Sequence, residues 1–208
     1  ESYIQNMLRV EAMQEGVTMI DPMSVFLSWD TVFGNDVTIE PNVFFGEGVE
    51  VADGVQIKAF SHIEQARIGK NSIIGPFARL RPGSELSENV KVGNFVEIKN
   101  AKLSNGVKAN HHGYIGDAEI GAGTNFSCGA ITVNYDGYQK HKTIIGENVM
   151  VGSNVSLIAP IEVGDGAFIA AGSTISENIP ADALAIERQK PDVKKGWAAE
   201  YKKRKQKK

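Results

Sequence analysis

The clearest pattern in the chain is a six-residue spacing of aliphatic side chains, often followed by glycine or another small residue. It occupies three uninterrupted runs: Val37, Val43, Val49 and Val55; Ile68, Ile74, Leu80, Leu86, Val92 and Ile98; and Ile145, Val151, Leu157, Val163, Ile169 and Ile175. An amphipathic helix would place apolar residues three and four apart, and a lone strand would alternate only briefly before a turn. The pattern therefore predicts a solenoid of short strands whose aliphatic residues point inward.

The hexapeptide repeat also predicts which residues become neighbours. Three hexapeptides would close one triangular coil, with glycine and asparagine supplying the backbone angles of the corners. Stacked coils pair strand on strand at about 4.8 Å, so residues eighteen apart should lie side by side. Motifs that are distant in the sequence can then share one site.

The repeat fails in three places, and these predict the domain organisation. Residues 1–16 carry a helical apolar stripe that ends at a glycine, and 17–178 form the coils. A loop is expected near 134–143, around the turn signal Asp136-Gly137. Residues 179–208, which contain two prolines, are expected to form an irregular arm and tail. Because the sequence begins with Glu1, we expect a piece of a longer or processed protein.

The composition suits one soluble domain with appendages. Of the 208 residues, 42% are apolar and 23% are charged. A single cysteine, Cys128, excludes an internal disulfide and a zinc site made of several cysteines, and it suits a reducing compartment. The chain has no apolar run of about eighteen residues and no signal segment. We therefore expect a cytoplasmic location and no membrane partner.

Charge is distributed unevenly along the chain. The last eight residues, YKKRKQKK, carry six positive charges, so residues 1–200 carry −9 against −3 for the whole chain. A run of like charge usually forms a solvated end. An acidic body would repel phosphates over any large footprint, so nucleic acid is not an expected partner.

Polar residues with chemical potential gather where the period breaks: Arg81, Lys99, His111, His112, Tyr114, Asn125, Asn134 and Tyr135. Arg81 and Lys99 are eighteen apart, so adjacent coils should present both cations to one anion, which suggests a phosphate. His62 and His141 are expected to be ordinary hydrogen-bonded wall residues.

Five segments carry a resemblance to a known family: RPGSEL, VGNFVEIKNAKL, KANHHGYIGDAEIG, ITVNYDG and KTIIGENVMVGSN. They resemble the acetyltransferase half of the bacterial bifunctional glucosamine-1-phosphate acetyltransferase and N-acetylglucosamine-1-phosphate uridylyltransferase family. The resemblance implies a left-handed parallel β-helix, a homotrimer, and acetyl transfer from acetyl-CoA to the amine of glucosamine 1-phosphate, for UDP-N-acetylglucosamine synthesis. The glycine-rich nucleotide segment of the uridylyl half is not found in these residues, so only the acetylating half is expected.

The resemblance also implies roles for individual residues. His111 would be the general base, and the acetyl transfer would need no metal. The sugar phosphate would be bound by Arg81, Lys99, Tyr114 and Asn125, and acetyl-CoA by Cys128, Asn134, Tyr135, Ser153, Ala171 and Arg188. The sequence departs from the family at His112 and Gly113, which stand where an apolar and a small hydroxyl residue are usual. We expect His112 to point into the prism or toward a neighbouring chain, and the Cys128 thiol only to pack.

Three alternatives remain open at this stage. Another acyltransferase of this fold could act on serine, a diaminopimelate precursor or a lipid A sugar, although the Arg81 and Lys99 pair disfavours these. A zinc carbonic anhydrase of this fold needs three suitably spaced histidines, which adjacent His111 and His112 fit poorly. A non-catalytic scaffold would use the solenoid as a binding surface.

Overall fold

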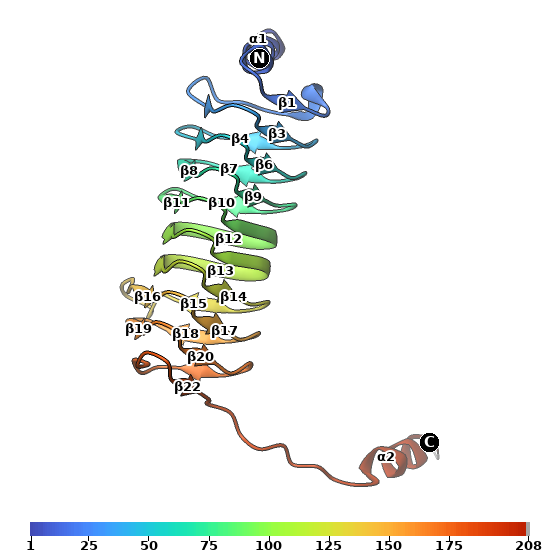
Figure 1. The fold of residues 1–208 in the computed structure, drawn as a ribbon. Coiled ribbons are helices and arrows are strands. Elements are labelled where there is room, and N and C mark those ends of the chain that lie inside the picture. The colour runs from blue at the N-terminus through green and yellow to red at the C-terminus, as the bar shows by residue number, and fades with distance from the viewer. Residues whose placement is uncertain (207–208) are drawn as a thin grey trace.

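A computed structural model describes residues 1–206 as a column of stacked coils with one helix at each end of the chain (Figure 1). The helical elements are α1 (Ser2–Gln14), the short 3₁₀ turn η1 (Pro22–Ser24) and α2 (Trp197–Gln206). The strands are β1 (Thr18–Met19), β2 (Val32–Phe33), β3 (Thr38–Ile39), β4 (Phe44–Phe45), β5 (Glu50–Val51), β6 (Gln56–Ile57), β7 (His62–Ile63), β8 (Ala66–Ile68), β9 (Ile73–Ile74), β10 (Arg79–Leu80), β11 (Ser84–Leu86), β12 (Lys91–Leu103), β13 (Lys108–Ile120), β14 (Asn125–Phe126), β15 (Ile131–Val133), β16 (Thr143–Ile145), β17 (Met150–Val151), β18 (Ser156–Ile158), β19 (Ile161–Val163), β20 (Phe168–Ile169), β21 (Thr174–Ile175) and β22 (Leu184–Ala185).

The core of the column consists of the aliphatic residues that repeat every six positions. All sixteen are buried, with at most 5% of the side chain exposed. Strands such as Thr38–Ile39 alternate outward and inward residues, and each pairs in parallel with the strand of the next coil. The predicted inward-facing aliphatic residues are confirmed, because burial of one side chain per hexapeptide is what holds the coils together.

Three lines of corner residues with positive φ divide the column into three faces. Glycine, asparagine and aspartate supply most of them, since these residues adopt left-handed backbone angles at low cost. The first corner holds Asp36, Gly54, Asn71, Asn89, Gly106, Gly123, Asn148, Gly166 and Asp182; the second holds Asn42, Phe60, Phe77, Phe95, His112, Gly129, Asn154 and Gly172; the third holds Gly48, Gln65, Gly83, Asn100 and Asp117.

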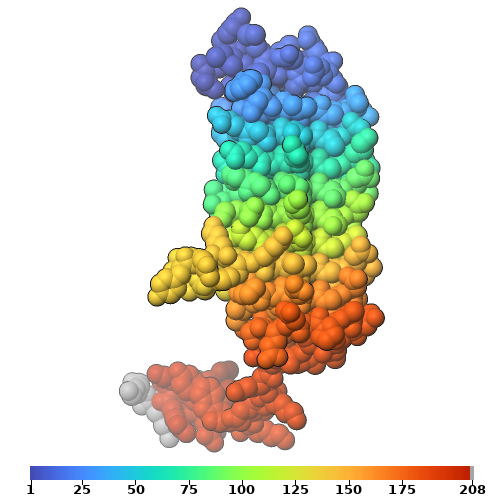
Figure 2. All heavy atoms as spheres, turned by 90° about the vertical axis from the view of Figure 1, so that its left-hand side faces the viewer, coloured from blue at the N-terminus to red at the C-terminus, as the bar shows by residue number. Residues whose placement is uncertain are grey.

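The register between coils is 17 or 18 residues along most of the column. Arg79 pairs with Glu97, and Glu97 pairs with Tyr114. The step then rises to 25, because Ala118 pairs with Thr143. The additional residues leave the column as a loop at the third corner, which projects clearly from the body in Figure 2. The predicted loop insertion therefore replaces one corner.

The two ends of the column are finished differently. Helix α1 covers the first coil through polar side chains, because Gln5 bonds both backbone groups of Leu27 and Arg9 donates to the carbonyl of Pro22. At the other end, an extended arm leads to α2, a helical segment within the tail expected to be irregular (Figure 1). Among residues 1–206, no helix is long and apolar enough to cross a membrane.

Candidate active site

His111 heads a line of predicted site residues that runs along the second corner. Backbone hydrogen bonds stack these positions, from Gly129 N–H to His112 C=O, Asn154 N–H to Cys128 C=O, and Gly172 N–H to Ser153 C=O. His111, Cys128, Ser153 and Ala171 each stand one residue before a corner residue. Arg188 returns from the C-terminal arm and donates to the carbonyl of Ala171 at 2.6 Å. The fold thus aligns residues spread over 78 positions of sequence.

A hollow of about 310 Å³ opens beside this line. It is lined by Asn110, His111, Asn125, Phe126, Ser127, Cys128 and Ser153. Four predicted site residues therefore share one concave surface. Asn125 faces it with its amide held by Ser127 Oγ at 2.9 Å, and the exposed Cys128 thiol lies on its wall.

The His111 ring is oriented by an asparagine that the sequence did not single out. His111 Nδ1 lies 3.2 Å from Asn94 Oδ1, one coil earlier, and Asn94 pairs directly with His111 in the sheet. An amide oxygen only accepts, so Nδ1 carries the proton and Nε2 is left as an acceptor. This is the tautomer a general base needs. The signal available from sequence was the 17-residue spacing to Asn94.

Arg81 and Lys99 occupy one line on adjacent coils at the far end of the next face. Arg79 pairs with Glu97, which places Arg81 beside Lys99 two residues further on. Arg81 Nη1 already binds Glu97 Oε1 at 2.8 Å, and this hydrogen bond raises the pKa of Arg81. Glu97 is therefore part of the cluster, although sequence reasoning had not selected it.

The expelled loop adds a further cation, Lys140, which sequence reasoning also missed. The Lys99 side chain lies against Lys140 and lowers the pKa of its ammonium group, while Asp117 and Tyr114 act in the opposite direction. Two ammonium groups held together are stabilised when an anion binds between them. Two lysines in the predicted loop segment NYDGYQKHK were the only sequence signal.

Tyr114 connects this cation cluster to the base of the loop. A Cβ atom on Gly116 would overlap the Tyr114 phenol, so glycine here lets the ring lie along its own strand. The hydroxyl thereby reaches Asn134 Nδ2 at 3.4 Å. Asn134 is almost fully buried, and its Nδ2 also donates to Asp117 Oδ2.

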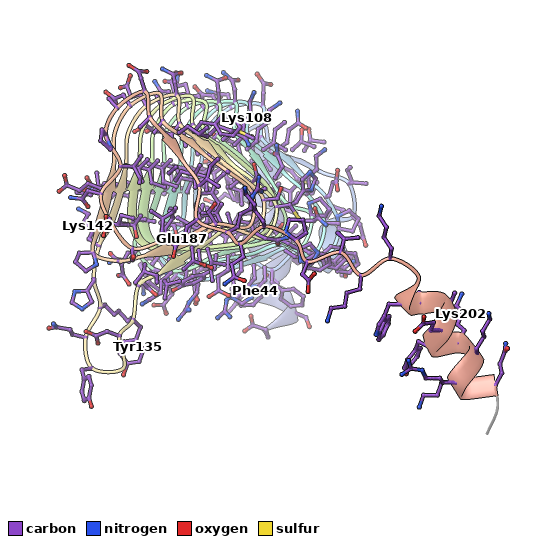
Figure 3. All side chains as sticks on the ribbon, turned by 90° about the horizontal axis from the view of Figure 1, so that it is seen from below. Phe44, Lys108, Tyr135, Lys142, Glu187 and Lys202 are labelled. Atoms are coloured by element: carbon purple, nitrogen blue, oxygen red, sulfur yellow. The ribbon has the colours of Figure 1, made fainter. Side chains whose placement is uncertain are left out.

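The loop is a hairpin fixed by its own polar groups. His141 N–H donates to Asn134 C=O at 2.8 Å and closes it, while Tyr135 Oη donates to Gly137 C=O at 2.6 Å. Asp136 accepts from the N–H groups of Gln139 and Tyr138 and from His141 Nε2, and these bonds hold the pKa of Asp136 far below its usual value. Figure 3 shows Tyr135 on this loop, away from the coils.

Sequence reasoning was partly wrong about His112. It does not point into the prism: it occupies the second corner with φ of 35°, is exposed, and packs on Phe95 with ring centroids 5.0 Å apart. A corner residue in the left-handed conformation turns outward, whereas the alternation expected for a flat strand would have turned it inward. His62 stacks on Phe44 and His141 holds Asp136, in keeping with roles in the wall and the loop.

The predicted site residues form two groups on different faces of one chain. His111, Asn125, Cys128, Ser153, Ala171 and Arg188 belong to the line and hollow beside the second corner, whereas Arg81, Lys99, Tyr114, Asn134 and Lys140 gather around the third corner. From His111 to Gly116, the partner of Lys99, the chain advances five residues, or roughly 16 Å of extended strand. Because the second corner is convex, the two groups point away from each other.

Comparison with known proteins agrees with this arrangement. The bacterial transferase hexapeptide family (six repeats) matches residues 65–100 and 142–177. The bifunctional protein GlmU of Zymomonas mobilis is 54% identical over 208 residues, which is all of this chain and 46% of that protein. GlmU of Sphingopyxis alaskensis is 52% identical over 97% of this chain and 45% of its own length. The chain is homologous to part of GlmU. The family expected from the motifs is thereby confirmed, and the chain spans less than half the length of these GlmU proteins.

Solved structures agree on the fold. LpxA from Acinetobacter baumannii superposes with a TM-score of 0.67 at 19% identity, covering 79% of this chain and 70% of LpxA. Such low identity relates the two folds and nothing more. The predicted architecture, a left-handed parallel β-helix, is confirmed. Both parts of the candidate site in this GlmU homologue are therefore built on rigid coils and on one expelled loop.

Proposed function

We propose that this chain transfers the acetyl group of acetyl-CoA to the amine of glucosamine 1-phosphate. The observation that carries the proposal is the line formed by His111, Cys128, Ser153 and Ala171, with the base at one end and Arg188 at the other. A long, thin thioester cofactor suits such a line. The cation cluster of Arg81, Lys99 and Lys140 suits the phosphate of the sugar.

The chemistry follows from the His111 tautomer. The substrate amine attacks the thioester carbonyl carbon, and His111 Nε2 accepts the proton that the nitrogen releases. The carbon–sulfur bond then breaks, and the thiolate of coenzyme A leaves and takes up a proton. Direct transfer between the two bound substrates accounts for all residues in the hollow, so no acetylated Cys128 and no metal ion enters the scheme.

A homotrimer would complete the site. The phosphate group of residues and the base lie on faces separated by a convex corner, so a single glucosamine phosphate cannot reach both on one chain. Packing the second-corner edge of one copy against the third-corner face of another would bring the two groups together. The exposed phenylalanines Phe60, Phe77 and Phe95 line that edge and offer an apolar contact.

The substrates place the reaction in the cytoplasm, where acetyl-CoA is made, and the product would feed synthesis of UDP-N-acetylglucosamine for cell-wall and lipopolysaccharide precursors. The decisive experiment incubates the chain with acetyl-CoA and glucosamine 1-phosphate and measures released thiol and acetylated sugar. Glucosamine without phosphate serves as the matched control and should react poorly. A chain that binds acetyl-CoA but acetylates serine or a lipid A sugar instead would favour another acyltransferase, and one that binds neither substrate would favour a scaffold.

A further inference from the structure

We propose that Asp117 is a positioning residue that sets the direction of a hydrogen-bond chain ending at the phosphate of the substrate. The inference rests on the proposed function and extends it to a residue that does not touch the sugar. Asp117 stands at the third corner with φ of 48°, where glycine or asparagine serves in neighbouring coils. A carboxylate at this corner therefore needs a reason beyond the backbone.

The contacts of Asp117 supply that reason. Its Oδ1 accepts from Asn100 Nδ2 at 2.6 Å, and its Oδ2 accepts from Asn134 Nδ2. An ionised carboxylate has no proton to donate, so it fixes which end of each amide faces it. Asn134 must present its NH₂ group to Asp117 and turn its carbonyl oxygen away.

This orientation is passed on to Tyr114. The same Asn134 Nδ2 that donates to Asp117 lies 3.4 Å from Tyr114 Oη, so the phenol oxygen accepts a hydrogen from it. The phenol proton is then free to be donated elsewhere. Lys99 and Lys140 lie beside this hydroxyl, so the anion that they attract is the acceptor it meets. Asp117 thereby makes Tyr114 a donor to phosphate.

Replacing the carboxylate by an amide tests this directionality. In Asp117→Asn, the new NH₂ group faces the NH₂ group of Asn134, and relief comes from rotating the Asn134 amide by half a turn. Its carbonyl would then face the new amide, and Tyr114 would lose the donor on which its own orientation depends. We expect the KM for glucosamine 1-phosphate to rise about tenfold, the effect of one charge-assisted hydrogen bond, while the KM for acetyl-CoA changes less.

A double-mutant cycle with Tyr114→Phe separates this from a loss of general stability. If Asp117 acts through the Tyr114 hydroxyl, the double variant should show the same rise of about tenfold as either single variant. Independent effects would multiply to about a hundredfold and would overturn the inference. Asp36→Asn is the matched control, because Asp36 occupies the first corner with φ of 57°. It should leave both KM values unchanged.

An exchange of the two groups gives a second test. In the variant Asp117→Asn with Asn134→Asp, the amide at 117 donates to the carboxylate at 134, so the bond and the melting temperature should recover. Tyr114 would now donate to that carboxylate, and the KM for the sugar phosphate should stay raised about tenfold. Recovery of the KM together with the melting temperature would show a purely structural role and would reject the proposal.

The cycle can also be measured without acetyl transfer. Calorimetry with inorganic phosphate on the four proteins of the cycle reports the same coupling through the dissociation constant. If the wild-type chain fails to acetylate glucosamine 1-phosphate but binds phosphate with non-additive losses, the proposed function is wrong and the role of Asp117 stands. If phosphate binding is absent, or if the losses multiply, the role of Asp117 is rejected.

Discussion

His111 and His112 are adjacent in sequence but differ in every contact that matters for chemistry. His111 faces the hollow and is held through Nδ1 by Asn94, while His112 stands on the corner and stacks against Phe95. The same side chain type therefore serves two purposes because a corner falls between them. Substitution can separate the two roles.

We expect His111→Ala to lower kcat by about a hundredfold or more, since a positioned general base typically contributes at least that factor. Binding of acetyl-CoA, measured by calorimetry, should be nearly unchanged. His112→Ala is the matched control and should alter thermal stability or assembly more than rate. A normal rate in His111→Ala, with an inactive His112→Ala, would mean that the base has been assigned one residue too early.

Lys140 gives a prediction about pH. The Lys99 ammonium lowers the pKa of Lys140 below its ordinary 10.5, so Lys140 loses its proton earlier than a free lysine as the pH rises. A neutral Lys140 attracts phosphate less, so affinity for glucosamine 1-phosphate should be highest where Lys140 is charged and should fall as the pH approaches 10.5 from below.

Calorimetry across this range would test the effect in the wild type and in Lys140→Met. The variant should bind more weakly at neutral pH, by roughly tenfold, and should show a shallower alkaline decline. Lys142→Met is the matched control from the same segment, because Lys142 is paired with Glu119. If the two variants behave alike, Lys140 has no special part in phosphate binding.

At the scale of elements, the coil below Tyr114 depends on a side chain where the backbone ladder is interrupted. The buried Thr132 hydroxyl accepts from Gly116 N–H at 2.8 Å and donates to Gly116 C=O at 3.0 Å. It replaces a strand neighbour at the position where the register changes. Two buried backbone groups next to the site are thereby satisfied.

We expect Thr132→Val to lower the free energy of unfolding by about 2 kcal/mol, because both Gly116 groups would be left buried without a partner. Thr132→Ser keeps the hydroxyl and should cost less. Denaturant titrations followed by circular dichroism would compare the two. Equal losses would indicate that the methyl group, and not the hydrogen bonds, matters at this position.

The regular elements could be predicted from sequence, whereas the loop contacts could not. A six-residue period constrains every coil in the same way, so the burial of residues such as Leu80 and Val151 follows from it directly. The meeting of Lys140 with Lys99 depends on the length and internal bonding of one loop, which no period encodes. Glu97 and Asn94 were missed for a related reason: their importance comes from the neighbour one coil away, and the spacing changes between 17 and 18.

At the scale of the whole molecule, the second corner carries an exposed aromatic ladder that a lone prism does not need. Phe60, Phe77 and Phe95 stack with centroids 4.8 and 5.2 Å apart, and each is about half exposed. All three have φ between 55° and 61°, a conformation that costs an ordinary residue roughly 1–2 kcal/mol. Glycine or asparagine would fill these corners at lower cost, so the ladder is best explained by a partner that covers it.

This ladder yields a prediction about assembly. Phe77→Asn places a residue that tolerates positive φ at the corner, so the coil itself should be about as stable as before. The apolar contact between copies would be weakened, and light scattering at micromolar concentration should show a shift from trimer toward monomer, with acetyl transfer falling in parallel. Gln65→Asn, at an exposed left-handed position of the third corner, is the matched control and should leave the mass unchanged. A trimeric and active Phe77→Asn would place the contact elsewhere, and a monomeric wild type with full activity would show that one chain completes the site alone.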